Sequence, residues 1–299
     1  MPAPRGKSAQ TTRQQSRRPS PLRVVFQGEP GANSEIACHA VYPDADAVPC
    51  PTFEDCFAAV TNGSADLAMI PIENSLAGRV ADIHHLLPTS RLHIVAEYFL
   101  PIHFQLMAVH GATLKTIRTV HSHIHALGQC RKIIRKHGWK AVVAGDTAGA
   151  AREIAEAGDI TMAALAPELA AGIYGLDILV RNVADADSNT TRFIVLSKHD
   201  ERAAAGEGPV VTTFVFRVRN VPAALYKAMG GFATNGVNMS KLESYQLDGR
   251  FTATQFYADV DGHPDDKGLA NALEELEFFS TEVRILGVYP ASEFRKGLR

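Results

Sequence analysis

The chain has 299 residues, 46% of them apolar and 21% charged, and this composition predicts a globular protein of about two domains. Residues 1–22 hold five of the 30 basic residues and none of the 32 acidic ones, so the rest of the chain is acidic. An acidic body binds polyanions poorly, and we expect no nucleic-acid partner. No apolar stretch of about 18 residues occurs, which argues against a membrane-spanning helix and a membrane partner.

The N-terminal segment 1–21 is basic, polar and rich in Pro, Gln and Ser, and it predicts a disordered tail. It lacks the apolar core of a secretory signal. An organellar transit peptide has a similar composition and stays open as an alternative, although no amphipathic apolar face is visible. The cysteines lack C-x-x-C spacing, which predicts reduced thiols and a cytoplasmic protein. They are Cys38, Cys50, Cys56 and Cys130.

Three histidines, His121, His123 and His125, stand at alternate positions. A metal site needs further ligands, and no second cluster has suitable spacing. We therefore expect no metal and interpret these side chains as surface or strand-end histidines.

Strand-like and helix-like segments alternate from residue 22 to about residue 200. The first series has a strand at "RVVFQ", a helix begun by Asn33 or Ser34, a helix from Thr52 with Asp55 in the capping-box position, and a strand at "DLAMIPIE". Such alternation predicts a parallel sheet with both faces covered.

A second series starts at "HFQLMAV" and includes a helix over 122–137, the strand "AVVAG", a helix from Thr147 and an Ala-rich segment stopped by Gly175. Two series predict two α/β lobes. The final strand of this region, "TRFIVL", is expected to return to the first sheet.

The segment 201–209 has the composition of a linker. After it, strand-like and helix-like segments follow one another in a different order. Residues 210–292 predict the order βαββαβ of a ferredoxin-like unit. Asp248-Gly249 between two alternating strands predicts a hairpin turn.

Polar residues follow several strand ends, where open α/β sheets bind ligands. Glu73, Asn74 and Ser75 follow one strand, and Ser122 with Gln129 follows another. The turn "GEPGANSEIA" can direct backbone N–H groups at an anion. Each of these groups is equally explained by helix capping. Without a Ser-His-Asp or Cys-His arrangement, they predict a site that binds and polarises its ligand rather than attacking it.

In order and spacing, "GEPGANSEIA", "IPIENSLAG", "VHSHIHALGQC", "AAGIYGLDIL" and "NTTRFIVL" together resemble the prephenate dehydratase family. The stretch "AALYKAMGGFATNGVNMSKLES" resembles the ACT regulatory domain. The resemblance implies an α/β catalytic domain over 22–200 with two lobes, like type II periplasmic binding proteins, and an ACT domain over 210–292.

The family reaction implied by this resemblance removes carbon dioxide and a ring hydroxyl from prephenate to give phenylpyruvate, in phenylalanine biosynthesis. It is a lyase reaction that needs no cofactor. Thr191 matches the family's essential threonine and is expected to donate a hydrogen bond to the leaving hydroxyl. Glu73 is expected to be either a general acid, if burial raises its pKa, or a residue that orients Asn74 or Thr191.

Further residues are expected to contact the substrate, with Arg192 and helix N-termini binding its two carboxylates and Phe193 packing beneath it. The substrate-binding residues expected from the resemblance are Asn74, Ser75, Ser122, Gln129, Thr190, Arg192 and Phe193.

The resemblance also implies feedback inhibition by phenylalanine at an ACT dimer interface, in a homodimer or homotetramer. The allosteric residues expected from it are Ala224, Leu225, Asn238, Glu243 and Ser244. The chain departs from the family pattern at Ser122-His123-Ile124-His125, at Ala223, and at Tyr245-Gln246. The last departure leaves it open whether phenylalanine binds.

Two alternatives remain at the level of the sequence. The chain could dehydrate arogenate, the amino analogue of prephenate, or it could be a ligand-binding or sensor protein that uses a two-lobed cleft without catalysis.

Overall fold

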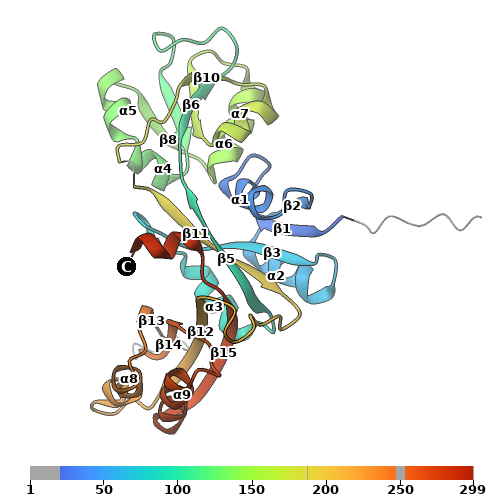
Figure 1. Cartoon of the computed structure of the whole chain (residues 1–299). Coiled ribbons are helices and arrows are strands. Elements are labelled where there is room, and N and C mark those ends of the chain that lie inside the picture. Colours follow the sequence, from blue (N-terminus) through green and yellow to red (C-terminus); the bar gives the residue numbers. More distant parts are fainter. Residues whose placement is uncertain (1–20, 187, 247–252, 299) are drawn as a thin grey trace, which may run out of the picture.

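The computed structural model describes residues 21–186, 188–246 and 253–298, which form two lobes and a C-terminal unit (Figure 1). A ten-stranded sheet has the order β13-β14-β12-β15-β5-β11-β3-β1-β2, with β4 paired to β3. A five-stranded sheet has the order β10-β6-β9-β7-β8. The first sheet therefore continues from the first lobe into the C-terminal unit, and the second sheet builds the second lobe alone.

The first lobe consists of β1 (Arg23–Gln27), α1 (Asn33–Val41), β2 (Asp46–Cys50), α2 (Phe53–Asn62), β3 (Leu67–Asn74), β4 (Gly78–Arg79), α3 (Ala81–Thr89), β5 (His93–Pro101) and β11 (Thr190–Ser197). The predicted cap of α2 is confirmed, because Thr52 Oγ1 accepts a hydrogen bond of 3.1 Å from the Asp55 backbone N–H. The predicted return to the first sheet is also confirmed, since β11 lies between β5 and β3.

The parallel sheet predicted for the first series is confirmed only in part. β11 is antiparallel to both of its neighbours, because the chain re-enters the sheet from the second lobe without a crossover helix. The strands β2, β1 and β3 are parallel, as expected.

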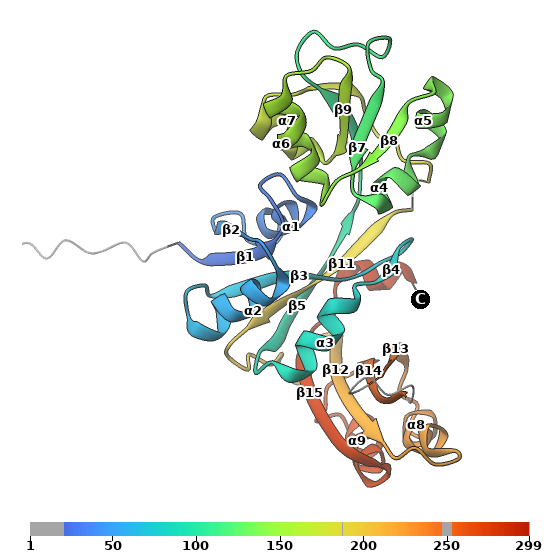
Figure 2. The same ribbon diagram turned by 180° about the vertical axis from the view of Figure 1, so that it is seen from behind.

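The second lobe consists of β6 (Gln105–Ala108), β7 (Thr119–Ser122), α4 (Ile124–Gln129), α5 (Arg131–His137), β8 (Lys140–Val143), α6 (Thr147–Ala157), β9 (Met162–Ala166), α7 (Glu168–Tyr174) and β10 (Asp177–Val180). Figure 2 shows its sheet from behind. The single helix predicted over 122–137 is divided at Cys130, where the backbone leaves helical geometry.

The C-terminal unit consists of β12 (Val210–Val218), α8 (Ala224–Thr234), β13 (Met239–Gln246), β14 (Ala253–Asp261), α9 (Lys267–Phe279), β15 (Ser280–Pro290) and the 3₁₀ helix η1 (Glu293–Leu298). The predicted βαββαβ order is confirmed. Within this unit the strands lie side by side in the order β13-β14-β12-β15.

Two predictions fall largely or wholly outside the described residues, namely the disordered tail over 1–21 and the hairpin turn at Asp248-Gly249. Among the helices that the structure describes, none combines the length and the apolar character needed to cross a membrane.

The turn between β1 and α1 contacts the second lobe. Glu29 accepts two hydrogen bonds from Arg152 of α6, at 2.6 and 3.0 Å, and the Tyr174 hydroxyl donates to the Pro30 carbonyl. Gly31 has φ +92°, and a Cβ there would lie 2.7 Å from Ala170 Cα of α7. Only glycine allows this close approach of the two lobes.

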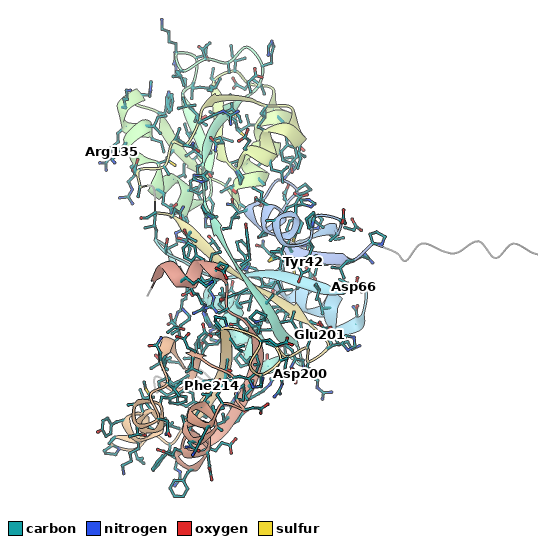
Figure 3. All side chains as sticks on the ribbon, viewed as in Figure 1. Tyr42, Asp66, Arg135, Asp200, Glu201 and Phe214 are labelled. Atoms are coloured by element: carbon teal, nitrogen blue, oxygen red, sulfur yellow. The ribbon has the colours of Figure 1, made fainter. Side chains whose placement is uncertain are left out.

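The first lobe and the C-terminal unit share an apolar core. One cluster of buried side chains includes Ile72 and Leu87 from the first lobe together with Val215, Tyr257 and Leu286 from the C-terminal unit. The opposite face of the C-terminal sheet has its own core under α8 and α9, which includes Phe214 (Figure 3).

β15 joins the first lobe at one backbone position, where Gly287 pairs with Ile94 of β5. A Cβ at position 287 would lie 2.7 Å from Ile94 Cβ and closer still to the Ile94 carbonyl oxygen. The join therefore requires a residue without a side chain.

We predict that Gly287→Ala lowers the free energy of unfolding by about 1–3 kcal/mol, because the added methyl group forces the two strands apart. Urea denaturation measures the change. Gly230→Ala in α8 is the control, since its added methyl group meets no atom within 4 Å. Equal stability of the two variants would contradict this account of the join.

Candidate active site

A cleft of about 680 Å³ lies between the two lobes. Its lining comes from the carboxyl ends of β1 and β3, from the N-terminal ends of α1, α2, α4 and α6, and from the start of β11. Of the residues expected at the site, Asn74, Gln129, Thr191 and Phe193 line this cleft.

Asn74 and Thr191 form a hydrogen-bonded pair on adjacent strands. They are direct partners in the register of β3 and β11, and Asn74 Nδ2 donates to Thr191 Oγ1 at 2.9 Å. Asn74 Oδ1 accepts from the backbone N–H groups of Leu76 and Ala77, which fixes the orientation of the amide. Because Thr191 Oγ1 accepts from Asn74, its own hydrogen is free to be donated to a ligand.

A second amide extends the pair to the other lobe. Asn189 Oδ1 accepts from Asn74 Nδ2 at 2.7 Å, and Asn189 Nδ2 donates to Gln129 Oε1 of α4 at 2.6 Å. Asn189 is 3% exposed and lines the cleft. Sequence reasoning did not select it, although it stands beside Thr190 in the recognised motif.

Four helices of nine or more residues begin at the cleft, and one of them is α3, whose N-cap residue Val80 and first-turn residue Asp82 line it. Asn33 and Ser34 open α1, Phe53 opens α2 and Thr147 opens α6, and all of these line the cavity. No side chain caps the N-terminus of α1. Free N–H groups and the positive end of the helix dipole favour an anion here, as predicted for the turn before α1.

Apolar side chains line the same space. Phe193 is 1% exposed, and Phe104 and Ile102 are nearly as buried. The cleft thus combines an apolar surface, a positioned hydroxyl donor and helix N-termini suited to anions.

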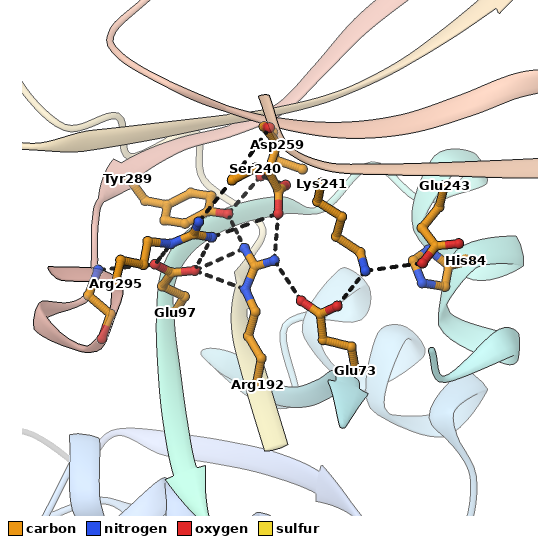
Figure 4. A network of polar contacts seen from close by, with 12 residues as sticks. Glu73, His84, Glu97, Arg192, Ser240, Lys241, Glu243, Asp259, Tyr289 and Arg295 are labelled. Carbon is orange, nitrogen blue, oxygen red and sulfur yellow. Dashed lines mark hydrogen bonds and ion pairs between the residues drawn. The ribbon is translucent and has the colours of Figure 1, made fainter. Parts of the chain in front are cut away.

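Arg192 and Glu73 do not line the cleft, which corrects the expectation that Arg192 binds a substrate carboxylate. Successive residues of a strand point to opposite faces of the sheet. Thr191 and Phe193 face the cleft, so Arg192 faces the C-terminal unit, and Glu73 beside Asn74 does the same (Figure 4).

Arg192 is 3% exposed and surrounded by acceptors. It donates to Glu97 at 2.9 Å, to Asp259 at 2.5 Å, to Glu73 at 3.2 Å and to the Tyr289 hydroxyl at 3.0 Å. Burial alone would lower the pKa of Arg192, but the Asp259 carboxylate together with Tyr289, Tyr257 and Glu97 outweighs burial and raises it well above its usual value.

Glu73 accepts a hydrogen bond of 2.5 Å from Lys241 of β13 in addition to the one from Arg192. Burial raises the pKa of Glu73, but Lys241 and Arg192 together outweigh burial and lower it below its usual value. The condition for a general acid is not met. Glu73 is instead held as a carboxylate by Lys241 and Arg192.

Three other expected substrate contacts lie outside the lining of the cleft. Ser122 is fully buried and donates to the Leu165 carbonyl at 2.6 Å. The Ser75 hydroxyl donates to the Ser188 carbonyl and accepts from the Thr190 N–H. Ser122 thus ties β7 to β9, and Ser75 ties the end of β3 to the start of β11, so these hydroxyls join strands.

Of the three spaced histidines, His123 and His125 line the cleft and His121 does not. His123 Nδ1 accepts from the His125 N–H at the start of α4. Burial, followed by the proximity of His125, lowers the pKa of His123, which favours its neutral form. Among the described residues no group of three His, Cys, Asp or Glu side chains could hold a metal ion.

β13 contacts the first lobe with alternate side chains. Lys241 binds Glu73, Glu243 lies 3.5 Å from Arg79 of β4, and the Tyr245 hydroxyl lies 2.6 Å from His84 Nδ1 of α3. The residue Tyr245, which departs from the family pattern, is therefore buried between the two units.

The residues expected at a regulatory site occupy two places. Ala224 and Leu225 begin α8, whereas Glu243 and Ser244 lie in β13 and Asn238 shortly before it. Among the described residues no hydrogen bond joins the two groups.

Fold and cleft together define a two-lobed protein whose cleft suits an anionic small molecule. Residues 24–201 match the family model of prephenate dehydratase. The chain therefore belongs to the prephenate dehydratase family and is an enzyme of the lyase type.

Two curated relatives show how the family varies. The chain is 51% identical to a bifunctional N-acyl-homoserine lactone acylase/prephenate dehydratase of Komagataeibacter europaeus, covering 91% of this chain and 97% of the relative. It is 38% identical to arogenate dehydratase/prephenate dehydratase 1 of Arabidopsis thaliana, covering 91% and 72%.

A solved structure extends the similarity to the whole fold. Prephenate dehydratase of Arthrobacter aurescens in complex with L-Phe is 32% identical, with a TM-score of 0.84 and 90% of each chain covered.

We predict that His84 makes the stability of the protein pH-dependent. Burial, followed by the proximity of Lys241, lowers its pKa from 6.5 to about 4. The unfolded chain binds a proton below about pH 6.5 and the folded chain does not. The stabilisation from a neutral His84 is therefore full above that pH and is lost as the pH falls toward 4, by about 3 kcal/mol in order of magnitude.

Urea denaturation between pH 4.5 and 7.5 measures this dependence. His84→Gln keeps an acceptor for Tyr245 and is expected to flatten the pH profile, whereas His85→Gln, at the exposed neighbour, leaves it unchanged. Parallel profiles for wild type and His84→Gln would refute the assignment.

Proposed function

We propose that the chain converts prephenate to phenylpyruvate with Thr191 as the hydrogen-bond donor to the leaving hydroxyl. The observation that carries this proposal is the Asn74–Thr191 pair in a cleft between lobes, in a chain of this family. We further propose that the lobes share the arrangement of type II periplasmic binding proteins, supported by two α/β units joined by the β5–β6 and β10–β11 crossings.

In the proposed complex the uncapped N-terminus of α1 binds a carboxylate of the dianionic substrate. The ring packs against Phe193 and Phe104. These contacts exclude water and hold the ring hydroxyl near Thr191.

The reaction breaks two bonds of the ring. The bond to the ring carboxylate breaks and releases carbon dioxide, its electron pair becomes part of the aromatic ring, and the hydroxyl leaves with the electrons of its carbon–oxygen bond. Thr191 stabilises the developing negative charge on that oxygen through a hydrogen bond. The released hydroxide then takes a proton from solvent to become water, because a threonine hydroxyl is too weak an acid to supply the proton itself.

The C-terminal unit is proposed to be an ACT domain that binds phenylalanine. Its βαββαβ order supports this assignment, as does the similar structure described in complex with L-Phe. We propose a homodimer or homotetramer formed through this unit. β13 is an edge strand, and the exposed apolar side chains of the unit include Val221, Tyr226, Leu242 and Phe278.

A cytoplasmic location remains part of the proposal. The four cysteines are free and buried, which supports a reducing compartment.

The proposed activity is tested by following phenylpyruvate formed from prephenate by its ultraviolet absorbance. The purified chain is expected to form it well above the slow spontaneous rate. Parallel assays with arogenate, detecting phenylalanine, separate the two substrates. If the chain turns over arogenate much faster than prephenate, arogenate is its substrate. If it turns over neither compound, a binding or sensor protein is favoured.

We predict that Thr191→Val lowers kcat by about 10²- to 10³-fold with KM changed little, because the donor acts on charge that develops in the transition state. Thr191→Ser restores the hydroxyl and most of the activity. A kcat for Thr191→Val within a few-fold of wild type would remove Thr191 from the mechanism.

A further inference from the structure

Arg79 lies where the cleft meets the C-terminal unit. It ends the two-residue strand β4, directly after Gly78, and lines the cleft. On its other side its guanidinium contacts β13 of the C-terminal unit, where Nη1 donates to the Ser244 carbonyl at 3.1 Å and lies 3.5 Å from Glu243 Oε2. One side chain therefore reaches both the proposed substrate site and the proposed regulatory element.

The charges around the cleft make Arg79 unusual. Among the described residues that line the cavity, it alone is a lysine or arginine, whereas Glu54, Asp82 and Asp146 contribute negative charge. Arg192 lies on the opposite face of the sheet, where its guanidinium donates to Glu97 and Asp259. A dianionic substrate gains from a side-chain cation here, because guanidinium–carboxylate hydrogen bonds are among the strongest that side chains form.

The contact of Arg79 with Glu243 is weak, so Arg79 can exchange it for another carboxylate. Its oxygen–nitrogen distance is 3.5 Å, and 45% of the Arg79 side chain is exposed. Exposed pairs of this kind add little stability. Glu243 also accepts from Lys241 at 3.2 Å, so it keeps a cationic partner when Arg79 moves away.

We propose that Arg79 binds a carboxylate of the substrate, and that Glu243 and Ser244 of β13 compete with the substrate for it. In one state the guanidinium is held by β13, as in this structure. In the other it is turned into the cleft and paired with the substrate. The inference rests on the proposed function, which supplies the dianionic substrate.

Regulation follows from this competition. A ligand of the C-terminal unit that fixes Glu243 and Ser244 in their present position holds Arg79 away from the substrate. Such a ligand raises KM, and by reciprocity the substrate weakens binding of that ligand. The coupling needs no movement of Thr191 or Asn74.

The test compares Arg79→Gln, Arg79→Lys and Glu243→Gln with wild type. Arg79→Gln is expected to raise KM for prephenate about 10- to 100-fold while kcat changes less than about threefold, because a carboxylate contact made in both ground and transition states is lost. Arg79→Lys recovers part of the affinity.

Glu243→Gln is expected to lower KM, since the competing carboxylate is gone, and to reduce the effect of added phenylalanine on KM. Arg217→Gln and Glu282→Gln are matched controls, because these residues form a similarly exposed pair within the C-terminal unit. They are expected to leave KM unchanged. Melting temperatures of all variants exclude misfolding as the cause.

Unchanged KM in Arg79→Gln would overturn the substrate contact. A raised KM in Arg79→Gln together with wild-type KM and phenylalanine response in Glu243→Gln would overturn the competition. Titration calorimetry with prephenate separates these failures from a failure of the proposed function. Loss of binding heat in Arg79→Gln supports the contact even if wild type proves inactive, and equal binding in both proteins refutes it.

Discussion

A cluster of charged side chains behind β11, most of them buried, constrains the geometry of the site. Its cations are Arg192, Lys241 and Arg295, and its anions are Glu73, Glu97, Asp259 and Glu243 (Figure 4). Charges taken out of water are tolerated only when they are paired, and removing one partner typically costs about 3–5 kcal/mol. The direction of Arg192 is therefore fixed.

The geometry of a strand carries this constraint to the cleft. If Arg192 must face the cluster, then Thr191 must face the opposite side, where the cavity lies. Glu73 and Asn74 are related in the same way on β3. The cluster therefore fixes the Asn74–Thr191 pair from the opposite face of the sheet, and part of this support, from Lys241, Asp259 and Arg295, belongs to the C-terminal unit. The unit is a structural part of the site as well as a candidate regulator.

Local signals in the sequence predicted much of this arrangement. The cap at Thr52, the stop at Gly175 and the βαββαβ order follow from nearby residues, and each was confirmed. Asn74 was noted because polar residues at strand ends mark ligand sites, and Thr191 was selected from the family resemblance. The directions of Arg192 and Glu73 were not deduced, because their partners lie up to 168 residues away and depend on how the C-terminal unit docks. Arg79 carries no local signal, since its role depends on β4 meeting β13.

The contact between Glu29 and Arg152 links the two lobes at one edge of the cleft. The two hydrogen bonds join the first lobe to the second, and both side chains remain about one-third exposed. Separating the lobes at this edge breaks this guanidinium–carboxylate pair. Dissolved ions screen the attraction between exposed charges over a distance of roughly 10 Å at 0.1 M salt. The pair is therefore a salt-sensitive link between the lobes, with the small energy that exposed ion pairs have.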